Sequence, residues 1–484
     1  MAETMTFADK YDITIGIECH VQLATATKLF SGADNDARDK APNSVVSPID
    51  FGLPGMLPVL NREAVNLAIK AGKALNSEIA RVSRFDRKHY FYPDLPKGYQ
   101  TTQMYNPIIL GGFVDAPLED GSMVHVRLHH AHMEEDAGKL THYSDYSLVD
   151  LNRAGTPLIE IVSEPDIHST VAAKAYATEL YRLMTYAGVT LGDLYHGNMR
   201  FDVNVSIAPK GATELGTRAE VKNLNSFKSV ERAAEYEFNR QAALLEKGER
   251  IVQETRGWDE AKQKTTSQRS KEDAQDYRYM PDADIPPIVL TEEEIIEIQS
   301  TLPNLPSFYR EAWKPLGLDS TVINALLASK QLAQGIQAIY ESAGESSARR
   351  NAQWFVSAVG PDDTESAVKA ITYLPERFVE LAAMVDTNEL SSTAAKTIFS
   401  ELLTGAKSAR AVAEDKNLLQ VSDDGAIAVI VDEVLADPAS AQAVKDLKDG
   451  NDKVIGFLVG QVMKKSQGKA NPELAQKLIR ERVQ

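Results

Sequence analysis

The sequence predicts an α+β fold for residues 1–290, with a mostly antiparallel sheet, followed by helical domains. Two observations support this prediction. In the first part, segments in which apolar and polar residues alternate, such as 13–23 and 200–207, are separated by helical patterns, and such one-faced strands are typical of antiparallel sheets. A proline-rich stretch from Pro281 to Pro306 then marks a boundary, after which alanine- and leucine-rich helical patterns replace the alternation.

Length and composition limit what the protein can be. A chain of 484 residues predicts roughly three domains, which we place at residues 1–290, 291–408 and 409–484. The single cysteine, Cys19, excludes an intramolecular disulfide and a cysteine-bound zinc. We find no secretory signal pattern and no apolar run long enough to cross a membrane, so we expect a soluble cytoplasmic protein.

The charge is unevenly distributed along the chain. The net charge of −17 argues against a general nucleic-acid-binding protein, because phosphate contacts need clustered Lys and Arg. Residues 453–484, however, hold seven Lys or Arg and only two Glu. A basic terminal segment is usually a solvated surface, but this segregation leaves phosphate contact as an alternative.

Residues 13–23 form the clearest predicted strand. Alternation places Cys19 on the apolar face, and Glu18 and His20 together on the polar face. We therefore expect the thiol in the core, where it would not act as a nucleophile. Glu18 and His20 belong either to a solvated strand face or to a binding site.

Residues 125–166 concentrate histidines and carboxylates. Five of the nine histidines lie between residues 125 and 142, around the adjacent Glu134 and Glu135. Glu160 lies within the apolar run LIEIV, where an unpaired carboxylate would be costly. The segment therefore predicts a cationic partner for these acids.

A candidate ligand set for Mg²⁺ or Mn²⁺ follows from these segments, because both ions prefer oxygen donors and tolerate an imidazole. The chain has no GxxxxGK[ST] or GxGxxG loop, so a nucleotide site would depend on a metal held by carboxylates. Alternation does not decide which of the two adjacent glutamates faces the site. The set contains Glu18, His20, Glu160 and either Glu134 or Glu135.

Two further segments contribute polar candidates. Residues 85–103 interleave aromatic rings with cations, which is typical either of a structured loop or of a platform for a base or phosphate, with Lys88 as a candidate contact. On the predicted strand 200–207, Arg200 belongs to a polar row that is either the wall of a site or a solvated face. Helices are predicted to begin after four good N-cap residues: Asn61, Ser169, Ser226 and Thr291.

Long motifs throughout the chain carry a resemblance to a known family. The first part contains IGIECHVQL, FDRKHYFYPDLPKGYQ, HMEEDAGK, SLVDLNRAGTPLIEIVSEPD, EVKNLNSF and DYRYMPDADIPP, and the end contains GFLVGQVMKKSQGKANPELAQKLI. Together they closely resemble the B subunits of the tRNA-dependent amidotransferases called GatCAB. The last motif resembles the tail of that family, which also occurs as the small YqeY protein.

The resemblance implies a fold and an activity. The N-terminal cradle of the family is similar to the catalytic architecture of glutamine synthetase and holds Mg²⁺ and ATP. It phosphorylates the side-chain carboxylate of Glu-tRNA(Gln) or Asp-tRNA(Asn), and ammonia from the glutaminase of the complex, its A subunit, then displaces the phosphate. With the small C subunit these proteins form a heterotrimer, in which the helical domain and tail of the B subunit hold the mischarged tRNA. The chain is thus expected to belong to an ATP-dependent, glutamine-hydrolysing amide ligase.

The resemblance also assigns residues to these roles. It selects Glu135 over Glu134, so that the catalytic and metal positions fall on Glu18, His20, Glu135 and Glu160. Nucleotide contacts fall on Lys88, with Arg200 of the polar row as a second candidate. The tRNA contacts fall on Lys464, Lys465 and Lys469.

Two other functions are compatible with the sequence. One is a tRNA-docking scaffold of the same complex whose cradle has no catalytic role. The other is a free-standing ligase acting on a small acid, against which the basic tail argues. The chain also departs from those family members that carry a cysteine-bound zinc in the cradle, because Cys19 is its only cysteine.

Overall fold

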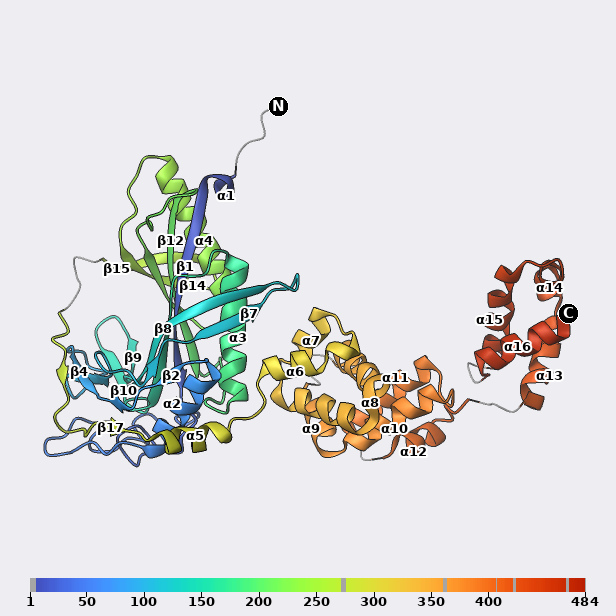
Figure 1. The fold of residues 1–484 in the computed structure, drawn as a ribbon, viewed down its shortest axis with the longest axis horizontal. Coiled ribbons are helices and arrows are strands. Elements are labelled where there is room, and N and C mark those ends of the chain that lie inside the picture. Colours follow the sequence, from blue (N-terminus) through green and yellow to red (C-terminus); the bar gives the residue numbers. More distant parts are fainter. Residues whose placement is uncertain are drawn as a thin grey trace. The chain divides into compact units, whose positions relative to one another are not determined.

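A computed structural model describes residues 6–270, 276–359, 364–405, 407–420, 424–466 and 470–483. The chain divides into two compact units, Met1–Pro306 and Ser307–Gln484 (Figure 1). The first contains a large sheet with helices and the second is helical, so the predicted order of an α+β domain and a helical region is confirmed. Among the described helices, none has both the length and the apolar character that a membrane span requires.

One ten-stranded sheet organises the first unit. All of its neighbouring strands pair antiparallel except β13 and β14, which are parallel. The predicted antiparallel character is therefore largely confirmed. The strands in order are β15 (Lys264–Ser270), β14 (Glu254–Asp259), β13 (Ala219–Leu224), β12 (Met199–Pro209), β1 (Tyr11–Gln22), β11 (Pro157–Ser163), β8 (Met123–Glu135), β6 (Ile109–Leu110) and β2 (Glu78–Ile79), with β7 (Phe113–Pro117) beside β8.

The central strand β1 has one buried face and one polar face. Ile15, Ile17, Cys19 and Val21 are at most 1% exposed and belong to the main core, as alternation predicts. Helices α3 (Thr170–Tyr186) and α4 (Phe227–Glu246) pack against the sheet and share this core (Figure 1). The other face of β1 carries polar side chains.

The predicted helix starts are confirmed by their caps. The side chain of Asn61 accepts a hydrogen bond from Glu63 N at the start of α2 (Arg62–Ala74). Ser169 and Ser226 cap α3 and α4 in the same way. Each cap satisfies a backbone N–H that would otherwise lack a partner.

The first unit ends later than the sequence predicts. Thr291 caps α5 (Glu292–Ser300) with a capping box, and α5 packs against α2. Ile295 is 3% exposed and lies in the main core, so α5 belongs to the first unit. The proline-rich stretch therefore marks the boundary at its C-terminal end, near Pro306, and the expected division at residue 290 is too early.

Short strands join segments that are distant in sequence. Strand β4 (Asp86–His89) pairs with β5 (Tyr99–Thr102) and β16 (Met280–Pro281), which brings the aromatic segment 85–103 beside 277–281. The remaining small sheets are the β9 (Lys139–His142) and β10 (Ser147–Asp150) hairpin, and the pair of β3 (Val82–Ser83) and β17 (Ile288–Val289).

Helices build the second unit in its described residues. The long α8 (Lys330–Ala358) is interrupted at Gly344, whose φ of 78° lies outside the helical region. Residues 427–483 gather into a core of their own, while the expected division at residue 408 stays a prediction. The other helices are α6 (Pro306–Ala312), α7 (Ser320–Leu326), α9 (Thr364–Tyr373), α10 (Pro375–Asp386), α11 (Ser392–Thr404), α12 (Ala409–Asp415), α13 (Asp424–Leu435), α14 (Ala441–Lys448), α15 (Ile455–Lys465) and α16 (Pro472–Val483).

Candidate functional site

The polar face of β1 presents a straight row of side chains. Glu18, His20 and Gln22 follow one another at every second position, and so lie roughly 7 Å apart along the strand. In the antiparallel register, Glu18 lies opposite Asp202 of β12, while His20 lies opposite Arg200 of β12 and Glu160 of β11. The register therefore concentrates charged groups on one face of three neighbouring strands.

A first cluster combines His20, Glu134 and Glu160. One ligand atom from each lies within 4.8 Å of the others. His20 Nε2 is 3.5 Å from Glu134 Oε1 and 3.7 Å from Glu160 Oε2. The Glu134 side chain is 4% exposed, so its carboxylate is buried. Two oxygens and one imidazole nitrogen form a donor set that suits Mg²⁺ or Mn²⁺.

The structure does not place Glu135 in this cluster. Adjacent residues of a strand point to opposite faces, and Glu135 follows Glu134 at the end of β8. Its carboxylate instead pairs with the Lys97 ammonium and accepts a hydrogen bond from Thr101 N at 2.9 Å. The expectation of Glu135 beside His20 and Glu160 is thus corrected, and Glu134 occupies that position.

His132 supplies a positive charge beside the first cluster. Its Nε2 is 3.2 Å from Glu160 Oε2 and 3.8 Å from Glu134 Oε2. Burial opposes the charged form, but the hydrogen bonds to Glu134 and Glu160 outweigh it and raise the pKa of His132 to about 10. Burial and the neighbouring imidazoles lower the pKa of His130 to about 4. Burial would raise the pKa of Glu160, but His132 holds it below its usual range, so this carboxylate stays ionised.

A second cluster combines Glu18, Asp202 and Glu220, again with ligand atoms within 4.8 Å of one another. Asn204 donates to Glu18 Oε1 at 3.1 Å. Lys222 Nζ lies 3.1 Å from Asp202 and 3.0 Å from Glu220. Burial, together with the charges of Glu160 and Glu220, raises the pKa of Glu18. A cation at this position would relieve the repulsion between the carboxylates.

Asp202 and Glu220 are functional candidates that the sequence-based ligand set omits. Asp202 belongs to the polar row of the predicted strand 200–207, and Glu220 lies on β13. Their meeting with Glu18 depends on the order of β13, β12 and β1, in which β13 pairs with β12 and β12 pairs with β1. The local sequence pattern does not predict this order of strands.

Lys88 and Arg200, the two candidate nucleotide contacts, have different surroundings. Burial lowers the pKa of Lys88, but the negative charges of Glu134 and Glu160 outweigh it and raise the pKa. Lys88 Nζ also lies 4.9 Å from the centre of the Tyr277 ring. Arg200 is anchored by Asp136, whose carboxylate is 3.2 Å away. Lys88 therefore lies within electrostatic reach of the first cluster, while Arg200 lies beside Asp136 and opposite His20.

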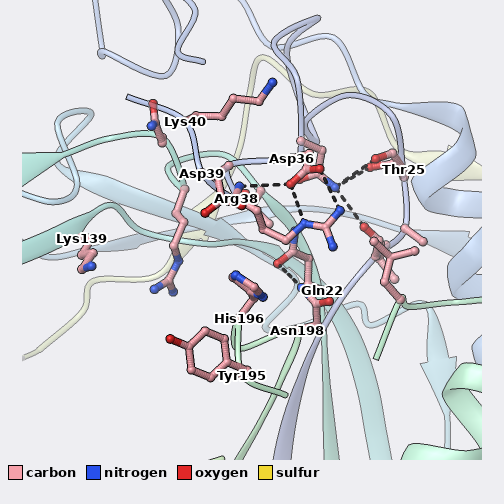
Figure 2. Close-up of a pocket in the computed structure, with 18 of the residues that line it drawn as sticks. Gln22, Thr25, Asp36, Arg38, Asp39, Lys40, Lys139, Tyr195, His196 and Asn198 are labelled. Carbon is pink, nitrogen blue, oxygen red and sulfur yellow. Dashed lines mark hydrogen bonds and ion pairs between the residues drawn. The ribbon is translucent and has the colours of Figure 1, made fainter. Parts of the chain in front are cut away.

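A cavity of about 550 Å³ opens at the Gln22 end of the row (Figure 2). Gln22 accepts a hydrogen bond from Asn198 at 3.1 Å, and Arg38 pairs with Asp36 at 2.8 Å. Figure 2 shows Tyr195 and His196 side by side, and the centres of their rings are 5.1 Å apart. A second cavity, of about 380 Å³, opens at the Glu18 end and is lined by Gly16, Pro165, Asn204, Leu215 and Arg218.

The candidate tRNA contacts lie in the second unit. Lys464 and Lys465 form the last turn of α15, where Lys465 Nζ pairs with Glu433 at 2.7 Å. Lys469 lies outside the described residues. The structure therefore gives exposed positions for two of the three predicted lysines.

Comparison with known proteins decides the family. Residues 13–296 match the GatB/GatE catalytic domain and residues 339–483 match the GatB domain. The chain is 42% identical to the B subunit of the aspartyl/glutamyl-tRNA(Asn/Gln) amidotransferase of Carboxydothermus hydrogenoformans, covering 98% of this chain and 99% of that protein. The chain belongs to this family of B subunits. The B subunits of Halorhodospira halophila and Trichodesmium erythraeum are similar members, at 45% and 43% identity over 98% and 100% of this chain and 99% and 100% of theirs.

Family membership agrees with the place of the clusters. The matched catalytic domain contains both of them, together with Lys88 and Arg200. The matched C-terminal domain contains Lys464 and Lys465. The chain is thus a subunit of an amidotransferase, a ligase type of enzyme that serves translation.

Proposed function

We propose that this protein phosphorylates the side-chain carboxylate of Glu-tRNA(Gln) or Asp-tRNA(Asn) at the expense of ATP. Ammonia then converts the activated acid to the amide. The observation that carries the proposal is the pair of adjacent carboxylate clusters. The first contains His20 and the second contains Glu18, and both residues lie on β1. The relatives named above are aspartyl/glutamyl-tRNA(Asn/Gln) amidotransferases, and the same tRNA substrates are proposed here.

The donor sets fit Mg²⁺ better than zinc. Carboxylate oxygens dominate both clusters, and the only thiol, Cys19, is buried in the core. His20, Glu134 and Glu160 would hold one ion, and Glu18, Asp202 and Glu220 a second. When bound, Mg²⁺ neutralises phosphate oxygens and so makes phosphoryl transfer between two anions possible.

The proposed reaction overcomes the poor leaving group of a carboxylic acid. An oxygen of the side-chain carboxylate attacks the γ-phosphorus of ATP, the bond to the β–γ bridging oxygen breaks, and ADP leaves. Ammonia attacks the carbonyl carbon of the acyl phosphate, phosphate leaves, and the nitrogen loses a proton. Lys88 and Arg200 contribute positive charge near the transferring group, where fixed charges stabilise the transition state.

The ammonia is proposed to come from a partner protein. Cys19 is 0% exposed and burial raises its pKa well above the usual range, so its thiol does not suit a glutaminase nucleophile. We accordingly propose a cytoplasmic heterotrimer in which this chain joins a glutaminase and a small third protein. The large antiparallel sheet with carboxylates on one face supports the proposed likeness of the cradle to glutamine synthetase.

The substitution Glu160→Gln tests this proposal in the reconstituted complex. It removes one charge from the first cluster and preserves shape, so formation of ADP with mischarged tRNA should fall roughly 100-fold or more. Glutamine hydrolysis by the partner and tRNA binding should remain. Unchanged amide formation would instead favour the docking scaffold. ADP formation by the chain alone with free glutamate and ammonia would favour a small-acid ligase.

A further inference from the structure

Strand β13 carries one residue more than its partner strand β12 in the region of Asp202. The core-facing residues of β13, each 0% exposed, are Ala219, Val221 and Leu224. Their spacing of two positions thus becomes three after Val221, and the register with β12 shifts at the same point. Asp202 therefore faces two residues of β13, Lys222 and Asn223, which is the arrangement of a β-bulge.

Asn223 has the backbone conformation that this bulge requires. Its φ of 66° lies in the left-handed region, which glycine and asparagine adopt more readily than other residues. Asn223 is exposed to solvent, so packing against neighbouring side chains does not explain the choice of residue. The property of Asn223 that matters here is therefore its tolerance of a positive φ.

The bulge directs two hydrogen-bond donors at one carboxylate of the second cluster. Asn223 N donates to Asp202 Oδ1 at 3.2 Å, and Lys222 Nζ donates to Asp202 Oδ2 at 3.1 Å. Lys222 Nζ also lies 3.0 Å from Glu220. Asp202 is buried, so these contacts, more than contacts with water, fix the orientation of its carboxylate.

Without the extra residue, this arrangement would be lost. In an unbroken strand, alternation would place residue 223 opposite Phe201 and turn its side chain toward the core. The bulge gives that core position to Leu224 and leaves the Asn223 N–H to bond Asp202. Hydrogen bonds to a metal-binding carboxylate fix its direction, and the loss of one typically lowers metal affinity about 10- to 100-fold.

We propose that Asn223 is a positioning residue for the cation site at the second cluster, because its left-handed backbone aims its own N–H and the Lys222 ammonium at Asp202. This assignment rests on the proposed function, in which the second cluster holds one of two Mg²⁺ ions. Asn223 acts through Asp202 and Lys222. A residue that adopts a positive φ at low cost can therefore replace it, whatever its side chain.

A series of substitutions at Asn223 in the full-length chain tests the assignment, with Mn²⁺ as the probe. Electron paramagnetic resonance measures free Mn²⁺ during a titration and so reports binding without ATP or tRNA. Wild type and Asn223→Gly should bind two ions with equal affinities. Asn223→Ala should weaken one of the two sites roughly tenfold. Asn223→Val should weaken it further, because a β-branched side chain opposes a positive φ more strongly; if this variant does not fold, the alanine and glycine variants decide.

Asn388 offers a matched control in the second unit. It is also exposed and has a φ of 58°. Asn388→Ala should therefore strain the backbone to a similar extent, yet leave both Mn²⁺ affinities unchanged. Hydrogen exchange gives a second readout, because the amide of residue 223 should exchange faster in Asn223→Ala than in Asn223→Gly.

Three results would overturn the assignment. The first is unchanged Mn²⁺ binding in Asn223→Ala, and the second is binding of fewer than two ions by wild type. The third is a loss in Asn223→Gly as large as in Asn223→Ala, because the side chain of Asn223 would then be the important group.

The reconstituted complex separates this assignment from the proposed function. Asn223→Ala should raise the Mg²⁺ concentration for half-maximal ADP formation roughly tenfold, with kcat at saturating Mg²⁺ close to that of wild type. A lowered kcat that Mg²⁺ does not restore would contradict a role in cation binding. If wild type forms no ADP, the proposed function fails, whereas the Mn²⁺ titration still tests the role of Asn223.

Discussion

Glu18 and His20 lie two residues apart on the polar face of β1, and each belongs to a different carboxylate cluster. A single strand therefore fixes the separation of the two candidate cation sites at roughly 7 Å along its axis. Both residues project from the centre of the sheet, where strands on each side hold β1 in place. Such support keeps the relative position of catalytic groups constant.

The adjacent glutamates of β8 should differ sharply in function. Glu134→Gln should lower ADP formation roughly 100-fold, because its carboxylate lies in the cluster with His20. Glu135→Gln should have a smaller effect on ADP formation, and should act mainly on stability through the lost ion pair with Lys97. Steady-state ADP release and Mg²⁺ titration compare the two variants. A full loss of activity in well-folded Glu135→Gln alone would restore the assignment that the family resemblance implies.

Lys222 should act as the internal counter-ion of the second cluster. The substitution Lys222→Met leaves Asp202 and Glu220 without their cation. Without Mg²⁺, the free energy of unfolding should fall by about 1–2 kcal/mol, a reduced figure because the lysine side chain is partly exposed to solvent. Thermal unfolding with and without Mg²⁺ tests this, and the ion should stabilise Lys222→Met more than wild type. Equal stabilisation of both proteins would argue against cation binding at the second cluster.

A buried ion pair should control the stability of the loop that follows β1. Lys28 is 0% exposed, and its Nζ lies 3.4 Å from Asp50, which also accepts from Ser31 and Ser47. Lys28→Met leaves a buried carboxylate unpaired and should lower the free energy of unfolding by about 3 kcal/mol. Denaturant titration of the first unit measures this change.

Lys28 should also make the free energy of unfolding depend on pH. Burial lowers the pKa of Lys28 below its usual 10.5, although Asp50 opposes the shift. As pH rises, the folded chain releases this proton before the unfolded chain does, so wild type should gain stability relative to Lys28→Met between the lowered pKa and 10.5. Denaturant titrations of both proteins across this range should show the difference growing with pH. A constant difference would contradict the lowered pKa.

The basic C-terminal segment, residues 453–484, should increase the affinity for tRNA through its positive charge. Lys464 is exposed on α15 and has no carboxylate partner among the described residues, whereas Lys465 pairs with Glu433. Lys464→Glu should raise the KM for mischarged tRNA and reduce its dependence on salt, while leaving the KM for ATP unchanged. The exposed Lys262, in the turn between β14 and β15, provides the control as Lys262→Glu. Parallel increases in both KM values would show that the effect is not confined to tRNA.

The local sequence pattern predicts much of the first unit. Alternation gives β1 and its two faces, including the burial of Cys19, and the caps Asn61, Ser169, Ser226 and Thr291 give four helix starts. The domain boundary is less well predicted, because α5 has the pattern of a helical domain and yet packs against α2. Only the tertiary contact assigns it to the first unit.

The candidate site is predicted only in part. Glu18, His20 and Glu160 are identified by strand position, and the structure brings His20 and Glu160 together. Alternation cannot choose between Glu134 and Glu135, because the pattern around them is mixed on both faces of β8. Asp202 and Glu220 join the site only through the order of strands, a long-range property.

The strict alternation of β1 makes its length a fixed quantity. Deleting one residue between Gly16 and Gln22 would exchange the two faces of the strand beyond the deletion. Residues after the deletion that now lie on the polar face, such as His20 or Gln22, would then turn toward the core. Replacement of single side chains would leave the register intact. Over evolutionary time, this strand should therefore accept changes of residue but exclude insertions and deletions, while length variation collects in the loops that line the larger cavity.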